Sequence, residues 1–322
     1  MGYRRTEYPT FSWSHTRQRT LDACPRRYYW QYYAAHNGWE RDAPATARAA
    51  WTLKQLSTYP LALGTAVHDQ ARRVGLAVRD GQPIPAYHTL RESARGALNR
   101  LYARSRDRAA FLAAPSCHVI TADAYYGRPS PPDMFERLRD RLGRCLTNLL
   151  DQPLWDEIAP LPPSVVRVVD DVATFDVDGV TVYVAPDLVV RAPRAGWIVV
   201  DWKSGSDGDA AEAQIALYAC YLRDGLGVPA RDGGYEGRVV TLETGRTAVY
   251  HVGADDLEAA RARVGDGVRR MRAYVSDPTR NAPLPAEAFP LAPDRRACRY
   301  CQYRELCAPD LALAADGTGP VA

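Results

Sequence analysis

The stretch Val199-Val200-Asp201-Trp202-Lys203-Ser204-Gly205 decides the fold, because it reads as an apolar strand that ends in a carboxylate and a lysine. Residues two apart on a strand point to the same face, so Asp201 and Lys203 are expected to project together. Asp187, in Ala185-Pro186-Asp187, can join them from the preceding strand. Two carboxylates on one face repel each other and are costly to bury without a cation. The pattern therefore indicates a site for a hard divalent ion, Mg²⁺ or Mn²⁺.

Lys203 is one of only two lysines in the chain, the other being Lys54, so 39 of the 41 basic residues are arginines. A compact ammonium beside a metal ion can hold the attacking water and stabilise charge that develops on a phosphate. Arginine does not readily give up a proton and spreads its charge over a plane. An ordinary ion pair at a strand end is the alternative interpretation of Asp-x-Lys taken alone.

The pattern of apolar residues around this stretch predicts an α/β fold. Three strands are expected at 165–177, 180–190 and 197–200, followed by shorter strands around 239–240 and 248–252. Helices are expected at 11–36 with a break at Cys24-Pro25, at 64–80, over most of 88–150, at 209–223 and at 255–275. Strands followed by helices favour a mixed sheet with helices packed on it.

Two further pairs of residues accompany the strands. Gln214 and Tyr218 are four apart on a predicted helix and share one face, where they can orient water or contact a phosphate. His68 follows Gly64 by four residues on another predicted helix, and its imidazole can ligate a metal. Taken singly, neither pair is specific.

The ordered set Gly64-x-x-x-His68, Pro186-Asp187, Asp201-x-Lys203 and Gln214-x-x-x-Tyr218 resembles the RecB-type branch of the PD-(D/E)xK nuclease superfamily. The resemblance implies a restriction-endonuclease-like mixed central sheet flanked by helices. It also implies that His68, Asp187 and Asp201 bind the metal, that Lys203 assists the attack, and that Gln214 and Tyr218 complete the site.

Seven cysteines are present, and three of them form Cys298-x2-Cys301-x5-Cys307 near the end of the chain. Three close thiols need a fourth to complete a cluster, and Cys24 is the natural candidate. This split pattern resembles AddB-type nuclease domains and the small RecB-like nucleases associated with CRISPR systems, as does Cys24-Pro25-Arg26-Arg27-Tyr28-Tyr29. The resemblance implies a 4Fe–4S cluster that joins the chain ends, whereas structural zinc is the alternative.

Length and composition are compatible with this interpretation. The chain has 322 residues and 46% hydrophobic residues, which is enough for a large composite domain. We expect an N-terminal helical region at 1–160, a nuclease core at 161–280, and a cysteine segment with a tail at 281–322. No apolar run is long enough to span a bilayer, and a cytoplasmic location is expected.

The net charge is only +3, but arginines concentrate between Arg91 and Arg144. Arg100, Arg104 and Arg108 are expected to share one helical face in a basic wall that guides a nucleic acid strand; a solvated helix face is the alternative. The aromatic run Tyr28 to Tyr33 could stack on bases or pack into the core.

The expected function is metal-dependent hydrolysis of phosphodiester bonds, by an exonuclease acting on single-stranded DNA or DNA ends, in repair, CRISPR adaptation or phage defence. A non-catalytic DNA-binding or assembly module and an RNA nuclease are the alternatives. Neither lysine follows a glycine, so the chain has no Walker A motif. Either the protein acts alone, or a separate helicase or a CRISPR or defence protein is its partner.

Overall fold

The computed structural model of the chain describes residues 5–192, 196–205, 211–230 and 234–315. The N-terminal half consists of β1 (Trp13–Ser14), α1 (His15–Ala23), α2 (Pro25–Tyr29), a π-helical turn (Trp30–Ala34), α3 (Ala45–Lys54), α4 (Tyr59–Arg79), α5 (Tyr87–Arg104), α6 (Arg108–Ala113), α7 (Ala122–Tyr125), α8 (Met134–Leu150) and α9 (Pro153–Ile158). The second half consists of β2 (Val166–Val169), β3 (Ala173–Val177), β4 (Val180–Val184), β5 (Leu188–Ala192), β6 (Gly196–Lys203), α10 (Ala211–Cys220), β7 (Tyr235–Thr241), β8 (Arg246–Val252), α11 (Ala254–Arg272), β9 (Val275–Asp277), β10 (Ala282–Pro283) and α12 (Arg304–Ala315).

The main sheet has five strands in the order β2-β5-β6-β7-β8. β6 and β7 are parallel, whereas the other three neighbouring pairs are antiparallel. Parallel neighbours need a crossover connection, and α10 lies in the chain between β6 and β7. The sheet is therefore mixed, and together with the helices it agrees with the predicted α/β class.

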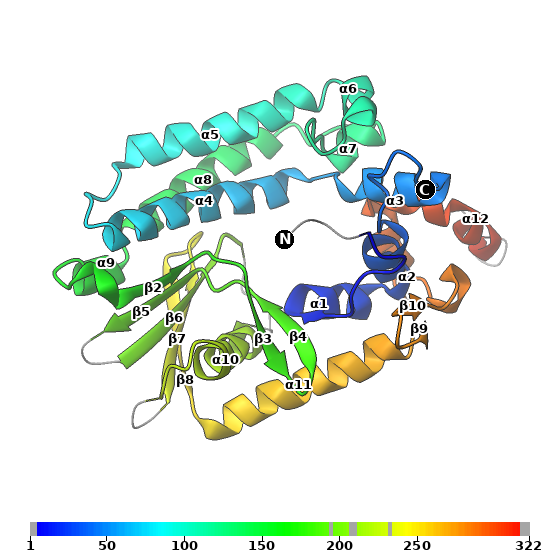
Figure 1. Cartoon of the computed structure of the whole chain (residues 1–322). Coiled ribbons are helices and arrows are strands. Elements are labelled where there is room, and N and C mark those ends of the chain that lie inside the picture. The colour runs from blue at the N-terminus through cyan, green and yellow to red at the C-terminus, as the bar shows by residue number, and fades with distance from the viewer. Residues whose placement is uncertain (1–4, 193–195, 206–210, 231–233, 316–322) are drawn as a thin grey trace.

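Helices cover both faces of this sheet (Figure 1). Val200 and Trp202 point into a core shared with α4 and α8, while Val199 points into a core shared with α10 and α11. Gly237 on β7 allows α10 to approach closely, because a Cβ at this position would lie 2.1 Å from Ile215 Cγ2. Alternate residues of β6 therefore face two different helical layers.

A second, three-stranded sheet has the order β1-β4-β3, with β1 parallel to β4. β3 and β4 are joined by Asp178 and Gly179, which both have positive φ, as a tight hairpin turn requires. The predicted long strands at 165–177 and 180–190 are wrong in extent, because each divides between the two sheets. The breaks fall at Asp170, with φ 49°, and at Pro186, which cannot donate a ladder hydrogen bond.

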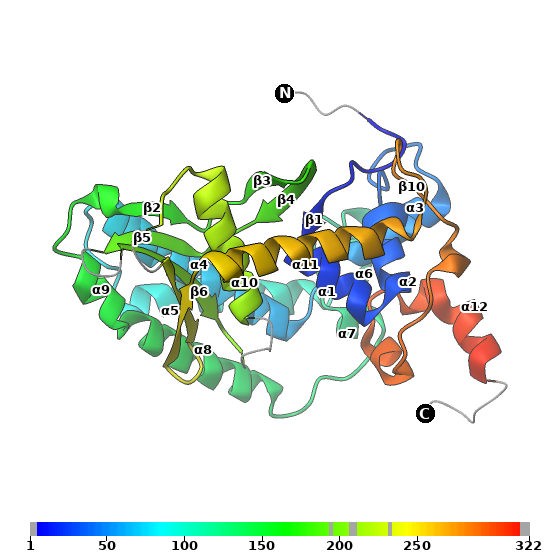
Figure 2. The ribbon, with the colours of Figure 1, turned by 90° about the horizontal axis from the view of Figure 1, so that it is seen from below.

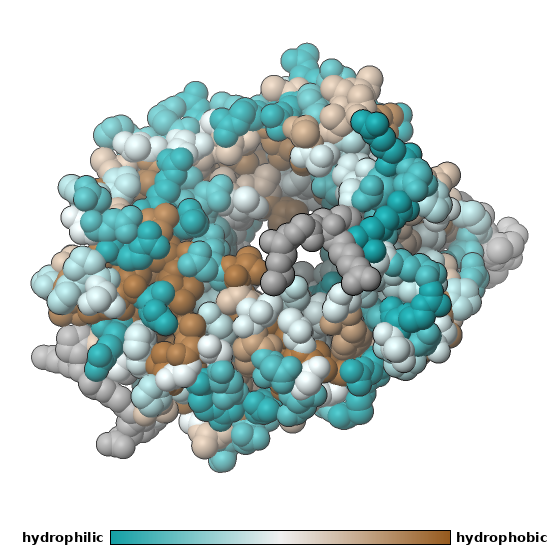
Figure 3. All heavy atoms as spheres, viewed as in Figure 1, coloured by the Kyte–Doolittle hydropathy of each residue, from teal (hydrophilic) through white to brown (hydrophobic). Residues whose placement is uncertain are grey.

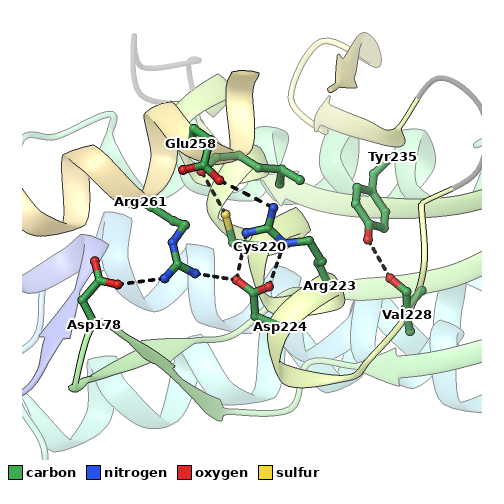
Figure 4. Close-up of polar contacts among 9 residues, drawn as sticks. Asp178, Cys220, Arg223, Asp224, Val228, Tyr235, Glu258 and Arg261 are labelled. Carbon is green, nitrogen blue, oxygen red and sulfur yellow. Dashed lines mark hydrogen bonds and ion pairs between the residues drawn. The ribbon is translucent and has the colours of Figure 1, made fainter. Parts of the chain in front are cut away.

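Helix α11 runs from the region of the sheets to the elements at the chain ends, as Figure 2 shows. Polar contacts hold its first half (Figure 4). Arg261 pairs with Asp178 of the hairpin turn and with Asp224 after α10, each at 2.9 Å, and the Cys220 thiol contacts the Leu257 carbonyl. These contacts fix the β3–β4 hairpin relative to α10 and α11.

The chain ends share a separate core in which Trp30, Leu53, Phe111, Tyr303 and Cys307 are buried. The backbone N–H of Arg26 donates to the Pro290 carbonyl at 3.0 Å, which ties α2 to the C-terminal segment. Of the aromatic run, Tyr28, Trp30 and Tyr33 are buried. For these three residues, core packing rather than base stacking is confirmed.

Several predicted helices have different limits. The expected helix at 64–80 begins earlier, at Tyr59, where the Thr58 side chain accepts the Leu61 N–H. The stretch 88–150 contains four helices, and 11–36 contains a short strand, two helices and a π-helical turn. The expected helix at 209–223 ends in a π-helical turn, and its positions 209 and 210 lie outside the described residues.

Candidate active site

The two predicted carboxylates meet where β5 begins and β6 approaches its end. The antiparallel register pairs Leu188 with Val200, so Asp187 and Asp201 are the next opposed positions. Both side chains are buried. The strand pattern inferred from the sequence therefore brings this pair together through backbone register alone.

An ion pair at Asp201 and a chain of hydrogen bonds that begins at Lys203 connect the site. Lys203 Nζ lies 2.6 Å from Asp201 Oδ2 and donates to Gln214 Oε1 at 2.9 Å. Gln214 Nε2 lies 2.6 Å from the Tyr218 hydroxyl, which donates to the Ala185 carbonyl at 3.0 Å. One connected network thus joins the end of β6, helix α10 and the segment that precedes Asp187.

Asp187 is held by two other partners. Its Oδ2 accepts the backbone N–H of Trp202 at 2.7 Å, and its Oδ1 lies 3.0 Å from His68 Nδ1. His68 projects from α4, which packs on the opposite face of the sheet from α10. Gly64, one turn earlier, allows α4 to approach, because a Cβ there would lie 3.2 Å from Ser204 Oγ.

Burial and mutual repulsion dominate the electrostatics. Burial raises the pKa of Asp201 to about 6, with the Asp187 charge adding to the rise and Lys203 opposing it. Burial lowers the pKa of His68, but its hydrogen bond with Asp187 and the charges of Asp187 and Asp201 outweigh this, and the pKa is raised. Burial, then the Asp201 and Asp187 charges, raise the pKa of Tyr218 far above its ordinary value. The site favours positive charge.

A divalent cation suits this donor set. Within the described part of the chain, no donor forms a well-directed hydrogen bond with the buried Asp201 Oδ2, although the Lys203 ammonium lies beside it. A buried carboxylate oxygen with incomplete pairing and a second carboxylate opposite it match the hard oxygen ligands of Mg²⁺ and Mn²⁺. However, across residues 5–192, 196–205, 211–230 and 234–315 no three His, Cys, Asp or Glu side chains surround a common point suited to a metal. Asp187 Oδ1 is directed instead toward His68.

Arg141 also supports the site, although its role was not predicted from the sequence. Its Nε donates to the Ser204 carbonyl at 2.8 Å and pairs with Glu243 at 3.0 Å, so that α8 fixes the segment after Lys203. In the sequence Arg141 was one of many arginines in a helical stretch. Its separation of 63 positions from Ser204 left no local signal of this contact.

The four cysteines of the predicted cluster come from both ends of the chain into one region. Burial raises the pKa of Cys298, Cys301 and Cys307, that of Cys307 to about 11, and the charge of Cys24 acts in the same direction on all three. Cys301 and Cys307 pack in the core that contains Trp30, and the backbone N–H of Arg26, two residues after Cys24, donates to the Pro290 carbonyl. All seven cysteines are free thiols, and the four do not surround a common metal position.

Three of these thiols accept hydrogen bonds from nitrogen donors. Cys24 accepts the Arg27 N–H at 3.4 Å, Cys301 accepts the Tyr303 N–H at 3.4 Å, and Cys307 accepts the indole N–H of Trp30 at 3.2 Å. Trp30 and Cys307 are 277 positions apart in the sequence. The contact brings the first and last parts of the chain together.

The prediction that three arginines share one helical face is wrong for Arg108. Arg100 and Arg104 lie on α5, which ends at Arg104, whereas Arg108 begins α6. Arg108 lies over the Tyr125 ring, 4.5 Å from its centroid. The break at 105–107, where Asp107 caps α6, removes Arg108 from that face.

No helix in the described part of the chain is both long and apolar enough to cross a membrane.

In Figure 3 the face seen in Figure 1 is hollowed near its centre, between the helical layer of α4 and α5 and the sheets.

Comparison with known proteins gives one assignment. A model of the PD-(D/E)XK nuclease superfamily matches residues 12–308. No curated protein matches the chain. A solved structure titled "Crystal structure of SSO0001" is similar at 16% identity and a TM-score of 0.27, covering 75% of this chain and 84% of that one. The family match spans nearly the whole sequence, and the chain therefore belongs to the PD-(D/E)XK nuclease superfamily.

Proposed function

We propose that the chain is a Mg²⁺- or Mn²⁺-dependent exonuclease that hydrolyses single-stranded DNA or DNA ends. Membership of the superfamily implies metal-dependent nuclease activity. The observation that carries the proposal is the opposition of Asp187 and Asp201, both buried, with the Lys203 ammonium 2.6 Å from Asp201.

In the proposed site, Asp187, Asp201 and His68 would hold the cation. When bound, it would polarise the scissile phosphate and lower the pKa of an attacking water. Lys203 stabilises charge that develops on the phosphate oxygens, because its ammonium is compact and only partly exposed. Gln214 orients Lys203 by accepting a hydrogen bond from its ammonium. Tyr218 holds Gln214 in place, because its hydroxyl accepts from the Gln214 amide and donates to the Ala185 carbonyl.

The hydrogen bond of His68 limits how its ring can bind a cation. Its Nδ1 is engaged with Asp187 Oδ1, which leaves Nε2 as the ring nitrogen available to a cation. For Asp187 and His68 to bind one cation together, this hydrogen bond has to open or the ring has to turn. His68→Gln is therefore expected to weaken metal affinity less than Asp201→Asn does.

We also propose that Cys24, Cys298, Cys301 and Cys307 hold a 4Fe–4S cluster. The support is that one region contains these four thiols, three of which accept N–H hydrogen bonds, a type of contact that tunes iron–sulfur clusters. Protein purified without oxygen should be brown, with about four irons per chain. Colourless protein with stoichiometric zinc would replace the cluster with a structural zinc site.

The proposed setting is the cytoplasm, in DNA repair, CRISPR adaptation or phage defence, with a separate helicase or defence protein as partner. The experiment that tests the activity is incubation of the purified chain with Mn²⁺ and end-labelled single-stranded DNA, double-stranded DNA or RNA. The proposal predicts shortening of single-stranded DNA from an end and no cleavage in EDTA. Selective RNA cleavage would identify an RNA nuclease, and binding without cleavage would identify a DNA-binding module.

A further inference from the structure

A cavity of about 300 Å³ lies between α5 and α8, with Tyr59 at the start of α4 contributing to its wall. α5 and α8 pack side by side in the helical layer (Figure 1). The aliphatic part of its lining is Leu98, Leu138 and Leu142. This cavity is separate from the carboxylate–lysine site.

The cavity exposes aromatic rings to an unusual degree. Tyr102 is 47% exposed and Phe135 is 43% exposed, although both are large and mainly apolar. The two rings meet edge to face with their centroids 5.1 Å apart, and the centroids of the Phe135 and Tyr59 rings are 5.3 Å apart. Large exposed apolar side chains that gather at a cavity mark a binding site more often than a solvated surface.

The polar part of the lining carries positive charge only. Arg91, Arg95 and Arg139 line the cavity, and no acidic residue among those that the structure describes lines it. Their ion pairs with neighbouring acids on the helix surface are 3.4–3.9 Å long and solvent-exposed. Exposed pairs of this kind are weak, so the guanidinium groups can turn to an anionic ligand. Asn99 adds a side-chain amide that can both donate to and accept from a base edge.

We propose that this cavity binds an unpaired nucleotide of a single-stranded nucleic acid, with the base against Tyr102 and Phe135 and the phosphate against the arginines. Aromatic stacking combined with arginine contacts is the chemistry by which proteins hold single strands. The inference deepens the proposed function, because it adds a substrate subsite to the nuclease.

The position of the cavity fits a strand that extends to the carboxylates. Tyr59 and His68 both lie on α4, about 14 Å apart along the helix axis. Leu142 lines the cavity, and its neighbour Arg141 holds the Ser204 carbonyl next to the site. Helix α8 thus lines the cavity and also supports the carboxylate–lysine site.

The test is the affinity of a fluorescein-labelled oligothymidylate, measured by anisotropy in EDTA so that cleavage cannot interfere. Tyr102→Leu and Phe135→Leu keep an apolar side chain but remove the ring face, and each should weaken binding by about tenfold. Tyr183→Leu is the matched control, because Tyr183 is 45% exposed on β4, away from the cavity, and it should bind as the unaltered chain does.

A second readout uses the unaltered chain cross-linked to a 4-thiothymidine oligonucleotide. Cross-links should map to peptides from α5 or α8. The inference is overturned if Tyr102→Leu and Phe135→Leu bind as tightly as Tyr183→Leu, or if all cross-links lie elsewhere, as a protein-docking role for the cavity would give. If Tyr102-dependent binding is found but Mn²⁺ produces no cleavage, the proposed nuclease function fails and the nucleotide subsite stands.

Discussion

The carboxylate–lysine site and the cysteine region bring their residues together in opposite ways. The first is organised by strand register, which opposes Asp187 and Asp201, and by a hydrogen-bond network from Lys203 to the Ala185 carbonyl. The second gathers thiols from both ends of the chain around a shared apolar core. Register and sheet packing persist when a polar side chain is removed, whereas a link between distant segments depends on its ligands. We therefore expect the two regions to fail differently.

The largest effect is expected in the cysteine region. Cys24→Ser removes one ligand of the proposed cluster and opens a link across nearly the whole chain. By analogy with long disulfide loops, the free energy of unfolding should fall by on the order of 5 kcal/mol. Urea unfolding of anaerobically purified protein measures it, with Cys117→Ser as control because that thiol is exposed. Equal stability of the two variants would show that the protein core alone holds the ends together.

The carboxylates should behave in the reverse manner. Asp201→Asn should lower the cleavage rate by on the order of 10³-fold, because an anionic metal ligand is lost. Burial raises the pKa of Asp201, which means that its ionised form is disfavoured in the fold. The fold should therefore persist when a neutral asparagine side chain replaces it. Mn²⁺ should raise the melting temperature of the unaltered chain and not that of Asp201→Asn. An equal Mn²⁺-induced shift in both would place the cation elsewhere.

Lys203→Arg sharpens the comparison within the site. The planar guanidinium keeps the positive charge but does not fit the short contacts to Asp201 and Gln214, so cleavage should fall by about 10²-fold. Single-turnover rates with saturating single-stranded DNA would measure the chemical step. A rate equal to that of the unaltered chain would reduce the role of Lys203 to charge alone.

The smallest effect is expected in the helical layer. Arg100→Gln with Arg104→Gln should flatten the slope of log affinity against log salt for single-stranded DNA by about one to two units, roughly one per lost phosphate contact. Arg191→Gln, at an exposed position on β5, serves as the control. If both variants give the slope of the unaltered chain, the arginines of α5 are a solvated helix face.

The mixed α/β class and the proximity of the candidate site residues could be predicted from the sequence for a physical reason. Alternation on a strand places Asp201 with Lys203, and helical spacing places Gln214 with Tyr218, so local periodicity suffices for each pair. The family resemblance supplied the order of these pairs and the inclusion of His68. The structure links Lys203, Gln214 and Tyr218 by hydrogen bonds. It also places Asp201 beside Lys203 and His68 beside Asp187. The chemical roles of these residues remain predictions.

The remaining features depend on contacts that local patterns do not encode. The strand predictions ran through Asp170 and Pro186, because the β-branched composition continues across the points where the chain changes sheets. Arg108 fits an i,i+4 series with Arg104, but Asp107 caps a new helix and interrupts it. Arg141 and the α5–α8 cavity arise only when separate helices pack together.

The central claim is that Lys203 and the paired carboxylates form the hydrolytic site, and the two lysines of the chain allow a direct test. The measurement is the initial rate of Mn²⁺-dependent cleavage of end-labelled single-stranded DNA by Lys203→Ala and by Lys54→Ala, whose lysine lies at the exposed end of α3. The account predicts that Lys54→Ala cleaves at the rate of the unaltered chain and that Lys203→Ala is slower by on the order of 10³-fold. Cleavage by Lys203→Ala at the rate of Lys54→Ala would contradict it.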